Sequence, residues 1–365
     1  MPSALFTPLL IRGVTFPNRA WVSPMCQYTA TDGLANEWHR VHYGAMATGG
    51  AGLILVESTA VLPEGRISRD DLGLWNDDQA AALAPIVDFA HSQGALIGIQ
   101  IAHAGRKAST YAPGKGEGTV ALTDGGWPTV GPVATHYGAE RPPHALDEDG
   151  IRTVVQATAD AAARAAALGF DVLEVQGAHG YLLHEFCSPL TNIRHDHYGG
   201  SFDNRVRIVR ETVDAVRMVW PEQSPLFVRL PATDWVEGGW TLDDTVALAR
   251  ELKKQGVDLI DCTSGGLEPG EFEDPYPAYE VDFAHQVRTQ AGVPATAVGF
   301  ITEPAQAELL VASGQADAVM LGRVMLRQPR WPLAAAHALG DQVPWPLPYD
   351  RARPERALPR TAPAG

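Results

Sequence analysis

The chain has few cysteines and a shortage of positive charge. Only three of its 365 residues are cysteines, Cys26, Cys187 and Cys262, and they lie far apart. This odd, scattered set excludes a disulfide framework and suits a reducing compartment, so a cytoplasmic protein is expected. Lys and Arg number 28 against 43 Asp and Glu, for a formal net charge of −15. Since polyanion binding needs clustered basic side chains, neither nucleic acid nor an acidic lipid surface is expected as a partner.

Long apolar runs are also missing. No run reaches membrane-spanning length, and the N-terminus lacks the basic region and apolar core of a signal peptide. We therefore expect no membrane association and no export signal, and the remaining candidate partner is a small molecule. Residues 344–365 are rich in Pro and Arg and are expected to form an extended tail.

Short apolar segments alternate with helical segments along most of the chain. Eight strands are predicted, and seven helices between or after them. Because the strands show no polar alternation, both of their faces should be buried. The pattern favours a parallel (β/α)8 TIM barrel over a doubly wound open sheet. The strands are at 21–25, 52–57, 95–101, 171–176, 226–230, 259–262, 295–298 and 318–321, and the helices at 38–48, 78–93, 148–168, 202–220, 241–254, 282–291 and 302–313.

Two segments lie outside this alternation. Residues 9–19 alternate around Gly13 and predict a short hairpin that caps the barrel. Residues 107–143, after the third strand, are rich in Gly, Pro, Thr and Tyr and show neither helical nor strand periodicity. An irregular connection of this length predicts a lid or binding loop.

Polar side chains gather where the predicted strands end. The chemistry of a barrel lies at the C-terminal ends of its strands, and the fourth strand ends in Gln176, followed by His179 and Tyr181. Tyr181 could donate a proton to a developing carbanion, or only pack at the barrel mouth. The other strand ends contribute Pro24 to Tyr28, Glu57 to Ala60, Gln100, His103 and Arg229.

Glycines end the last three strands. Backbone N–H groups of such glycines can approach a phosphate, although the glycines could also serve only to end strands. Arg323 can pair with phosphate bidentately and favours the first interpretation, a phosphate-bearing cofactor. The segments concerned are Thr263 to Gly266, Gly299–Phe300 and Gly322–Arg323.

No metal site is expected. His184, His195 and His197 lack the helical His spacing and the matching carboxylate pattern of a metal centre. Cys26, at a strand end, could tune a redox cofactor or react with electrophiles, whereas Cys262, inside a strand, is most simply a small core residue.

The chain resembles the Old Yellow Enzyme family of FMN-dependent ene-reductases, and within it the thermophilic-like bacterial subclass. The resemblance covers Leu5 to about Arg351 and rests on six ordered motifs. These are Ser23–Tyr28, Gln100–Lys107, Ala178–Tyr181 with His184–Phe186, Tyr198–Ser201 with Asn204–Arg205, Phe227–Arg229, and Asp261–Gly265.

This resemblance implies that residues 1–345 form a single FMN-binding barrel. Arg229 would face the N1/O2 region of the flavin and stabilise its reduced anion. Pro24, Met25, Cys26, Ala60 and Gln100 would line the isoalloxazine. Ser264, Gly265, Gly299, Gly322 and Arg323 would hold the ribityl phosphate, and Ser23 and Phe300 complete the cofactor-binding set.

The resemblance also implies a reaction. NADPH or NADH would reduce the flavin, which would pass a hydride to an activated alkene, an α,β-unsaturated carbonyl or nitro compound, while Tyr181 protonates the α-carbon. His179 and the residue three positions before it would donate hydrogen bonds to the substrate oxygen, and Tyr28 would close over the substrate. The family has a His at that earlier position, whereas this chain has Gln176, which donates but cannot become cationic. Retuned activity is expected, with a flavin-binding barrel that has lost catalysis as the alternative.

The C-terminal residues 346–365 would contribute to a neighbouring subunit's site. Tyr349 and Arg351 match the aromatic residue and the Arg that close the subclass sequences, but residues 352–365 follow here. A homodimer or a dimer-based homotetramer is expected, with Arg351 reaching the neighbour's substrate.

Two other enzymes remain as alternatives. The first is a dienoyl-CoA reductase or amine dehydrogenase without its iron–sulfur module, which the lack of a Cys cluster disfavours. The second is a metal-dependent hydrolase that uses His103, His179 and His184.

Overall fold

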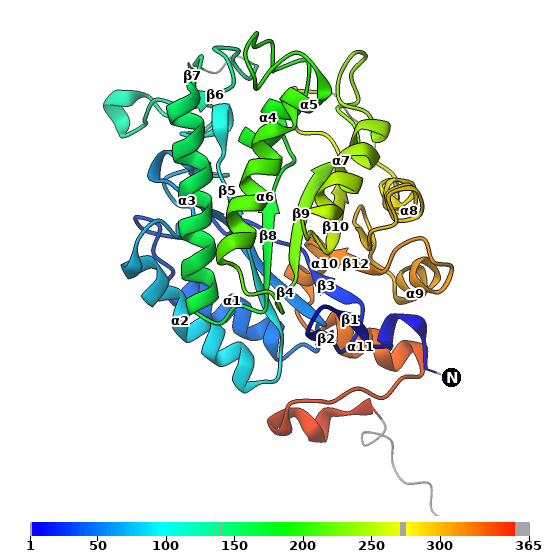
Figure 1. Ribbon diagram of the computed structural model, residues 1–365. Helices are drawn as coiled ribbons and strands as arrows, with labels where there is room; N and C mark the ends of the chain where they lie inside the picture. Colours follow the sequence, from blue (N-terminus) through cyan, green and yellow to red (C-terminus); the bar gives the residue numbers. More distant parts are fainter. Residues whose placement is uncertain (1, 139–140, 271–274, 355–365) are drawn as a thin grey trace, which may run out of the picture.

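The computed structural model describes residues 2–138, 141–270 and 275–354. Eight parallel strands close into a barrel in the order β10-β11-β12-β3-β4-β5-β8-β9, with helices packed around it (Figure 1). The predicted (β/α)8 barrel is therefore confirmed. The strands are β3 (Ala20–Val22), β4 (Leu53–Ala60), β5 (Ile97–Ala102), β8 (Val172–Gln176), β9 (Leu226–Pro231), β10 (Leu259–Thr263), β11 (Ala295–Ala297) and β12 (Ala318–Leu321).

The helices begin at residues whose side chains satisfy the free N–H groups of the first turn. Asp147 caps α3 through a 2.8 Å bond from the Gly150 N–H, and Thr241 forms a capping box with Asp244 at α7. The helices are α1 (Glu37–Ala47), α2 (Asp77–Ser92), α3 (Glu148–Ala167), α4 (Leu182–Cys187), α5 (Phe202–Arg205), α6 (Arg207–Val219), α7 (Leu242–Lys254), α8 (Val281–Gln286), α9 (Pro304–Ala312), α10 (Arg323–Arg327) and α11 (Trp331–Leu339).

The helix predicted over 202–220 is divided at Val206 into α5 and α6. Side chains of α5 bind the preceding loop, since Asn204 Nδ2 donates to Gly199 O at 2.9 Å and Arg205 Nε donates to Cys187 O at 2.8 Å. These tertiary contacts fix the direction of α5 and do not appear in the periodicity of the sequence.

The predicted hairpin closes the N-terminal end of the barrel. Strands β1 (Leu9–Ile11) and β2 (Val14–Phe16) pair antiparallel. They place the Phe16 ring 4.6 Å from Trp21 of β3, which in turn stacks on Phe227 of β9 at 5.8 Å. All three rings are fully buried. This aromatic plug fills the lower end of the barrel, so ligands must enter at the C-terminal ends of the strands.

The long segment after β5 lies over that open end (Figure 1). It contains two short strands, β6 (Val130–Gly131) and β7 (His144–Ala145), which pair with each other. Arg194, from the loop after α4, holds it through bonds from Nη1 to the carbonyls of Pro132 and Leu146 at 2.6 and 2.5 Å. The segment that was predicted as a lid is thus held in place by hydrogen bonds from Arg194.

The described part of the C-terminal tail forms a 3-10 helix, η6 (Leu347–Ala352). The Arg330 guanidinium lies 4.6 Å from the centre of the Tyr349 ring, and Arg330 Nη2 donates to its hydroxyl at 3.0 Å. Arg351 is exposed. The rest of the predicted tail, 355–365, lies outside the described residues. Within the described ranges, no helix is both long and apolar enough to cross a membrane.

Candidate active site

A cavity of about 340 Å³ lies at the C-terminal ends of β8 to β12. It brings together six residues that the sequence predicted for a site: His179, Arg229, Gly299, Phe300, Gly322 and Arg323. Thr263, from one of the predicted glycine segments, also lines it, as do Tyr279 and Glu280, which were not predicted as site residues. The predicted site residues of β3, β4 and β5 lie at the ends of the neighbouring strands of the same barrel.

One wall of the cavity is suited to a phosphate. Gly299 has a φ of 101°, and a Cβ there would lie 3.0 Å from the Tyr279 ring, so only glycine fits this position. The exposed guanidinium of Arg323 lies 4.4 Å from the centre of the Phe300 ring at the rim. A backbone free of side chains beside a guanidinium is a suitable cradle for an anionic phosphate.

Arg229 provides a fixed positive charge inside the cavity. Its Nε lies 3.1 Å from Asp261 Oδ2, and both side chains are buried. Burial alone would lower the pKa of Arg229, but the carboxyl groups of Asp261, Glu174 and Glu280 around it raise the pKa overall. A fixed cation therefore lines the cavity.

Gln176 and His179 form a chain of hydrogen bonds. Gln176 Nε2 lies 3.2 Å from His179 Nδ1, and His179 Nε2 lies 2.9 Å from Thr263 Oγ1. Gln176 Oε1 accepts from the Ala178 N–H at 3.0 Å, which fixes the carboxamide orientation. Since the amide nitrogen carries only donors, this network assigns His179 as the Nε2–H tautomer. Burial, with Arg229 and Lys107 adding to it, holds the pKa of His179 well below its usual range, so the ring stays neutral.

Gln100 closes this chain on the β5 side. It donates from Nε2 to Glu174 Oε1 at 2.7 Å, and its Oε1 lies 3.5 Å from Gln176 Nε2. Burial raises the pKa of Glu174 to about 8. Both N–H groups of Gln176 are thus directed at protein acceptors, His179 and Gln100.

Tyr181 follows His179 by two residues, and their rings meet edge to face with centres 6.4 Å apart. Burial raises the pKa of Tyr181 well above its usual range, so the phenol keeps its proton. Lys107 Nζ lies 5.3 Å from the centre of the Tyr181 ring and donates to His179 O and Gly266 O at 2.9 and 2.7 Å. The motif Gln100–Lys107 contained Lys107, but nothing in its spacing indicated this bridging role.

Cys26 and Tyr28 share a hydrogen bond. Burial raises the pKa of both groups, so Cys26 is a neutral thiol. Their segment is held from β4: Glu57 Oε2 accepts from the Gln27 N–H at 2.7 Å, and Glu57 Oε1 accepts from the Tyr43 hydroxyl at 3.0 Å. A neutral thiol can adjust a neighbouring redox group but is a weak nucleophile.

The remaining predicted residues divide into two groups. Ser23, Ala60 and Gln100 are buried, and Pro24 and Met25 are partly buried, at the ends of β3, β4 and β5. The Ser264 hydroxyl, next to Gly265, donates to Glu280 Oε1 at 2.8 Å. Arg351, in contrast, does not line the cavity of its own chain. Glu280 could not have been found from the sequence, because it only precedes a short helix and carries no motif.

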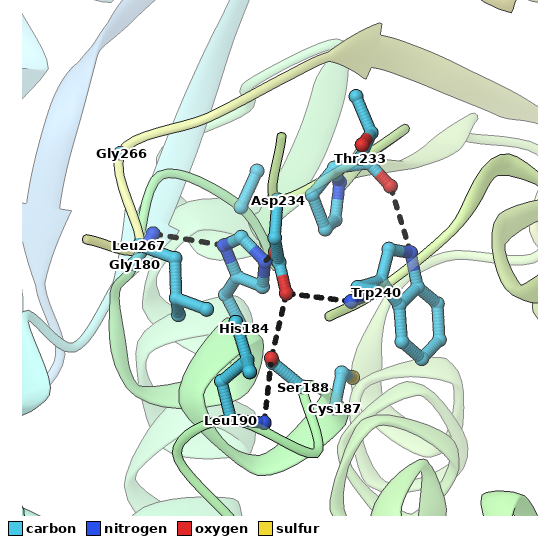
Figure 2. A network of polar contacts seen from close by, with 12 residues as sticks. Gly180, His184, Cys187, Ser188, Leu190, Thr233, Asp234, Trp240, Gly266 and Leu267 are labelled. Carbon is cyan, nitrogen blue, oxygen red and sulfur yellow. Dashed lines mark hydrogen bonds and ion pairs between the residues drawn. The ribbon is translucent and has the colours of Figure 1, made fainter. Parts of the chain in front are cut away.

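His184 cannot act as a metal ligand in this arrangement. Its Nδ1 accepts from the Gly180 N–H at 2.9 Å, and its Nε2 faces Asp234 Oδ1 at 2.7 Å (Figure 2). Both nitrogens are engaged in contacts within the protein, which disfavours the hydrolase alternative built on His103, His179 and His184. No three His, Cys, Asp or Glu side chains of the described residues group as metal ligands.

Comparison with known proteins agrees with the family resemblance found in the sequence. Residues 4–342 match the model of the NADH:flavin oxidoreductase / NADH oxidase family. The NADPH dehydrogenase of Geobacillus thermodenitrificans is 45% identical over 96% of this chain and 99% of its own length.

Solved structures of similar fold include morphinone reductase, at a TM-score of 0.78 and 27% identity, over 95% of this chain and 92% of that chain. A 2-naphthoyl-CoA reductase complex aligns with a TM-score of 0.83 and 25% identity over 93% of this chain. Here the chain spans about half of the similar protein, 52% of its length.

Proposed function

Because the chain belongs to the NADH:flavin oxidoreductase / NADH oxidase family, that of the Old Yellow Enzymes, and is an NAD(P)H-dependent flavin oxidoreductase, we propose that it is an FMN-dependent ene-reductase. Its substrates are alkenes activated by a carbonyl or nitro group. The observation that carries the proposal is that neutral His179 and protonated Tyr181 lie side by side at the barrel mouth.

The residues present fit FMN. Gly299, Gly322 and Arg323 would hold the phosphate, and Arg229 would face the N1/O2 region. The partly exposed Met25 and Cys26, with Ala60 and Gln100, offer a wall for the ring system. FMN held there would supply hydride chemistry, with NADPH or NADH as the source of the hydride and the β-carbon of the alkene as its acceptor.

His179 binds the substrate oxygen in this proposal. Its Nε2–H, which donates to Thr263 Oγ1 in the structure, would donate instead to the carbonyl or nitro oxygen and stabilise the negative charge that develops there. Gln176 keeps His179 Nδ1 as an acceptor. It thereby orients the donor, whether or not it also donates to the substrate.

Tyr181 supplies the proton. Its raised pKa keeps the phenol protonated at neutral pH, so it can protonate the α-carbon as charge develops there. Hydride at the β-carbon and a proton at the α-carbon together add H₂ across the double bond. Tyr28 would close over the substrate.

The quaternary structure belongs to the same proposal. Trp38 and Val41 of α1 are 56% and 69% exposed, and Leu347 of η6 is 87% exposed, an apolar surface that suits a second copy of the chain. In a homodimer or dimer-based homotetramer, Arg351 would reach the neighbour's substrate. The three cysteines are free, which agrees with the proposed cytoplasmic location.

Anaerobic stopped-flow spectroscopy tests the function. FMN-loaded protein is mixed first with NADPH and then with 2-cyclohexenone, while flavin absorbance is followed. Bleaching by NADPH followed by recovery with the enone is the expected result. Bleaching without enone-driven recovery would mean a flavin-binding barrel with lost alkene reduction, and the proposal would be wrong.

The iron–sulfur type of flavin barrel is the weaker candidate. The chain matches 99% of an NADPH dehydrogenase but only 52% of the 2-naphthoyl-CoA reductase chain. The three cysteines of this sequence lie far apart and form no ligand cluster for an iron–sulfur centre, which supports the ene-reductase.

A further inference from the structure

A buried network joins the loop after β9 to the loop that carries His179 and Tyr181. Its centre is Asp234, which is fully buried. Asp234 Oδ1 lies 2.7 Å from His184 Nε2, and Asp234 Oδ2 accepts from Ser188 Oγ and from the Trp240 N–H, each at 2.6 Å. Figure 2 shows these donors converging on the one carboxyl group. They keep the pKa of Asp234 below its usual value, although burial acts to raise it.

The network fixes the tautomer of His184. A backbone N–H, that of Gly180, points at His184 Nδ1 from 2.9 Å, so Nδ1 must be an acceptor. The ring proton therefore lies on Nε2, where the Asp234 carboxylate accepts it. His184 is fully buried.

Gly180 lies between His179 and Tyr181, whose side chains take part in the proposed reaction. Its φ is 69°, and that of His179 is 60°, so two successive residues adopt the left-handed conformation. For His179 this conformation is unfavourable and must be held by the surroundings. A Cβ on Gly180 would lie 2.1 Å from Gly266 O, so only glycine fits this position. The N–H of Gly180 is held by its bond to His184 Nδ1.

We propose that Asp234 and His184 are positioning residues of alkene reduction. Asp234 selects the His184 tautomer, His184 Nδ1 holds the Gly180 N–H, and this bond sets the relative placement of His179 and Tyr181. The inference rests on the proposed ene-reductase function. Neither Asp234 nor His184 lines the cavity, so both act through the loop and not on the substrate.

Asp234→Asn is the central test, because an amide cannot serve three donors. With its NH₂ group toward His184, the ring must carry its proton on Nδ1, which then faces the Gly180 N–H as a second donor. With its oxygen toward His184, the NH₂ group faces the Trp240 N–H. Enone-driven reoxidation is expected to slow by about 10- to 100-fold, the usual effect of misplacing reacting groups by about 1 Å.

Two readouts separate positioning from a general loss of structure. FMN affinity, measured by quenching of flavin fluorescence, and reoxidation by dioxygen, which needs neither His179 nor Tyr181, are expected to stay within about threefold of wild type. Ser188→Ala is the matched control: it removes one bond to Asp234 Oδ2 and leaves the His184 tautomer unchanged, so its enone step should match wild type.

His184→Asn provides the rescue. An Asn side-chain oxygen takes roughly the place of His Nδ1 and accepts from the Gly180 N–H in either background. The double variant Asp234→Asn/His184→Asn should therefore reoxidise with enone faster than Asp234→Asn alone, despite its lower melting temperature. A double variant no faster than Asp234→Asn, or an Asp234→Asn protein with a wild-type enone step, overturns the inference.

If Asp234→Asn fails to fold, a second pair of variants tests the positioning role. His184→Asn keeps an acceptor for Gly180, whereas His184→Leu has none, so only the Asn variant should retain the enone step; equal rates overturn the proposal. The wild type separates this result from the proposed function. A wild-type protein that is never reoxidised by enone contradicts the function itself, whereas a wild-type enone step in Asp234→Asn contradicts only the positioning role.

Discussion

At the scale of single residues, burial sets the protonation of the groups that the proposed reaction needs. It raises the pKa of Tyr181 and lowers that of His179, so one side chain keeps its proton and the other stays uncharged. The motif around His179 and Tyr181 predicted which residues meet at the mouth. It could not predict that Gln176 and Thr263 engage both nitrogens of His179, because side-chain rotamers depend on contacts between different strands.

Tyr181→Phe should abolish most of the proton delivery. Loss of a general acid costs about 10²- to 10⁴-fold, so enone-driven reoxidation should slow by that factor while reduction by NADPH changes little. Stopped-flow rates of the two half-reactions measure this difference. Tyr198→Phe, which loses only a 2.9 Å bond to Glu211, is the control. An unchanged enone step in Tyr181→Phe would assign the proton to another donor.

Gln176→His should raise turnover on cyclic enones. A charge-assisted donor is worth about 1 to 3 kcal/mol more than leaving the carbonyl without one, and imidazole can become cationic whereas a carboxamide cannot. Steady-state kcat with 2-cyclohexenone is the measurement. Gln176→Met, similar in length but without polar hydrogens, should lower kcat, since it no longer orients His179. If kcat of Gln176→His is equal to or below that of the wild type, Gln176 does not limit turnover.

At the scale of elements, the strands and most helices were predictable because buried parallel strands and capped helices leave strong local patterns. Helices were predicted to start at 148 and 241, and the structure begins them at the capping residues Asp147 and Thr241. The connections were less predictable. The short helix α4 was missed because its six residues are all buried and show no polar face, and α8 continues into a π-helical turn, Val287–Ala291, that no periodicity indicates.

If the protein binds FMN as proposed, the residue at the start of α8 should make that binding sensitive to pH. Glu280 precedes α8, lines the cavity with Arg323, and has a pKa raised by burial. As pH rises, the carboxyl group ionises and would repel the phosphate, so the dissociation constant of FMN should increase with pH. Glu280→Gln should bind FMN more tightly at pH 9 and show a flatter profile. Fluorescence titrations at several pH values check this, and a wild-type constant independent of pH would refute it.

At the scale of the whole molecule, buried carboxyl groups govern how stability varies with pH. Burial raises the pKa values of Glu57 and Glu185 to about 8, from about 4.3 in an unfolded chain. The folded state therefore holds their protons longer than the unfolded state, and stability falls as pH rises toward 8. His39, His42 and His103 have pKa values lowered to about 4, which acts in the opposite direction below pH 6.5.

Because the two effects oppose each other, the free energy of unfolding should decline only between pH 6.5 and 8. Each raised carboxyl group should lower the free energy of unfolding by about 2 kcal/mol over that range, whereas the histidines offset the carboxyl groups at lower pH. Urea unfolding at pH 5.5, 6.5 and 8 measures this. Glu57→Gln should reduce the slope above pH 6.5, and a slope equal to that of wild type would count against the assignment.

The predicted role of Arg351 in the C-terminal tail depends on the proposed oligomer. Truncation after Asp350 removes Arg351 and leaves the Arg330–Tyr349 contact in place. If Arg351 reaches a neighbour's substrate, KM for the enone should rise about tenfold, the cost of one charge-assisted hydrogen bond, with FMN affinity unchanged. Arg351→Ala should give the same result. Light scattering establishes whether the protein is a dimer, and an unchanged KM in both variants would exclude this role for Arg351.

The aromatic plug of Phe16, Trp21 and Phe227 leaves the barrel open only at the C-terminal ends of its strands. Under the proposed function, the reductant and the alkene would enter through this end in turn, and each product would leave by it before the next molecule enters. Kinetics should therefore follow a substituted-enzyme scheme, in which a large excess of either substrate slows the enzyme by occupying the entrance that the other needs.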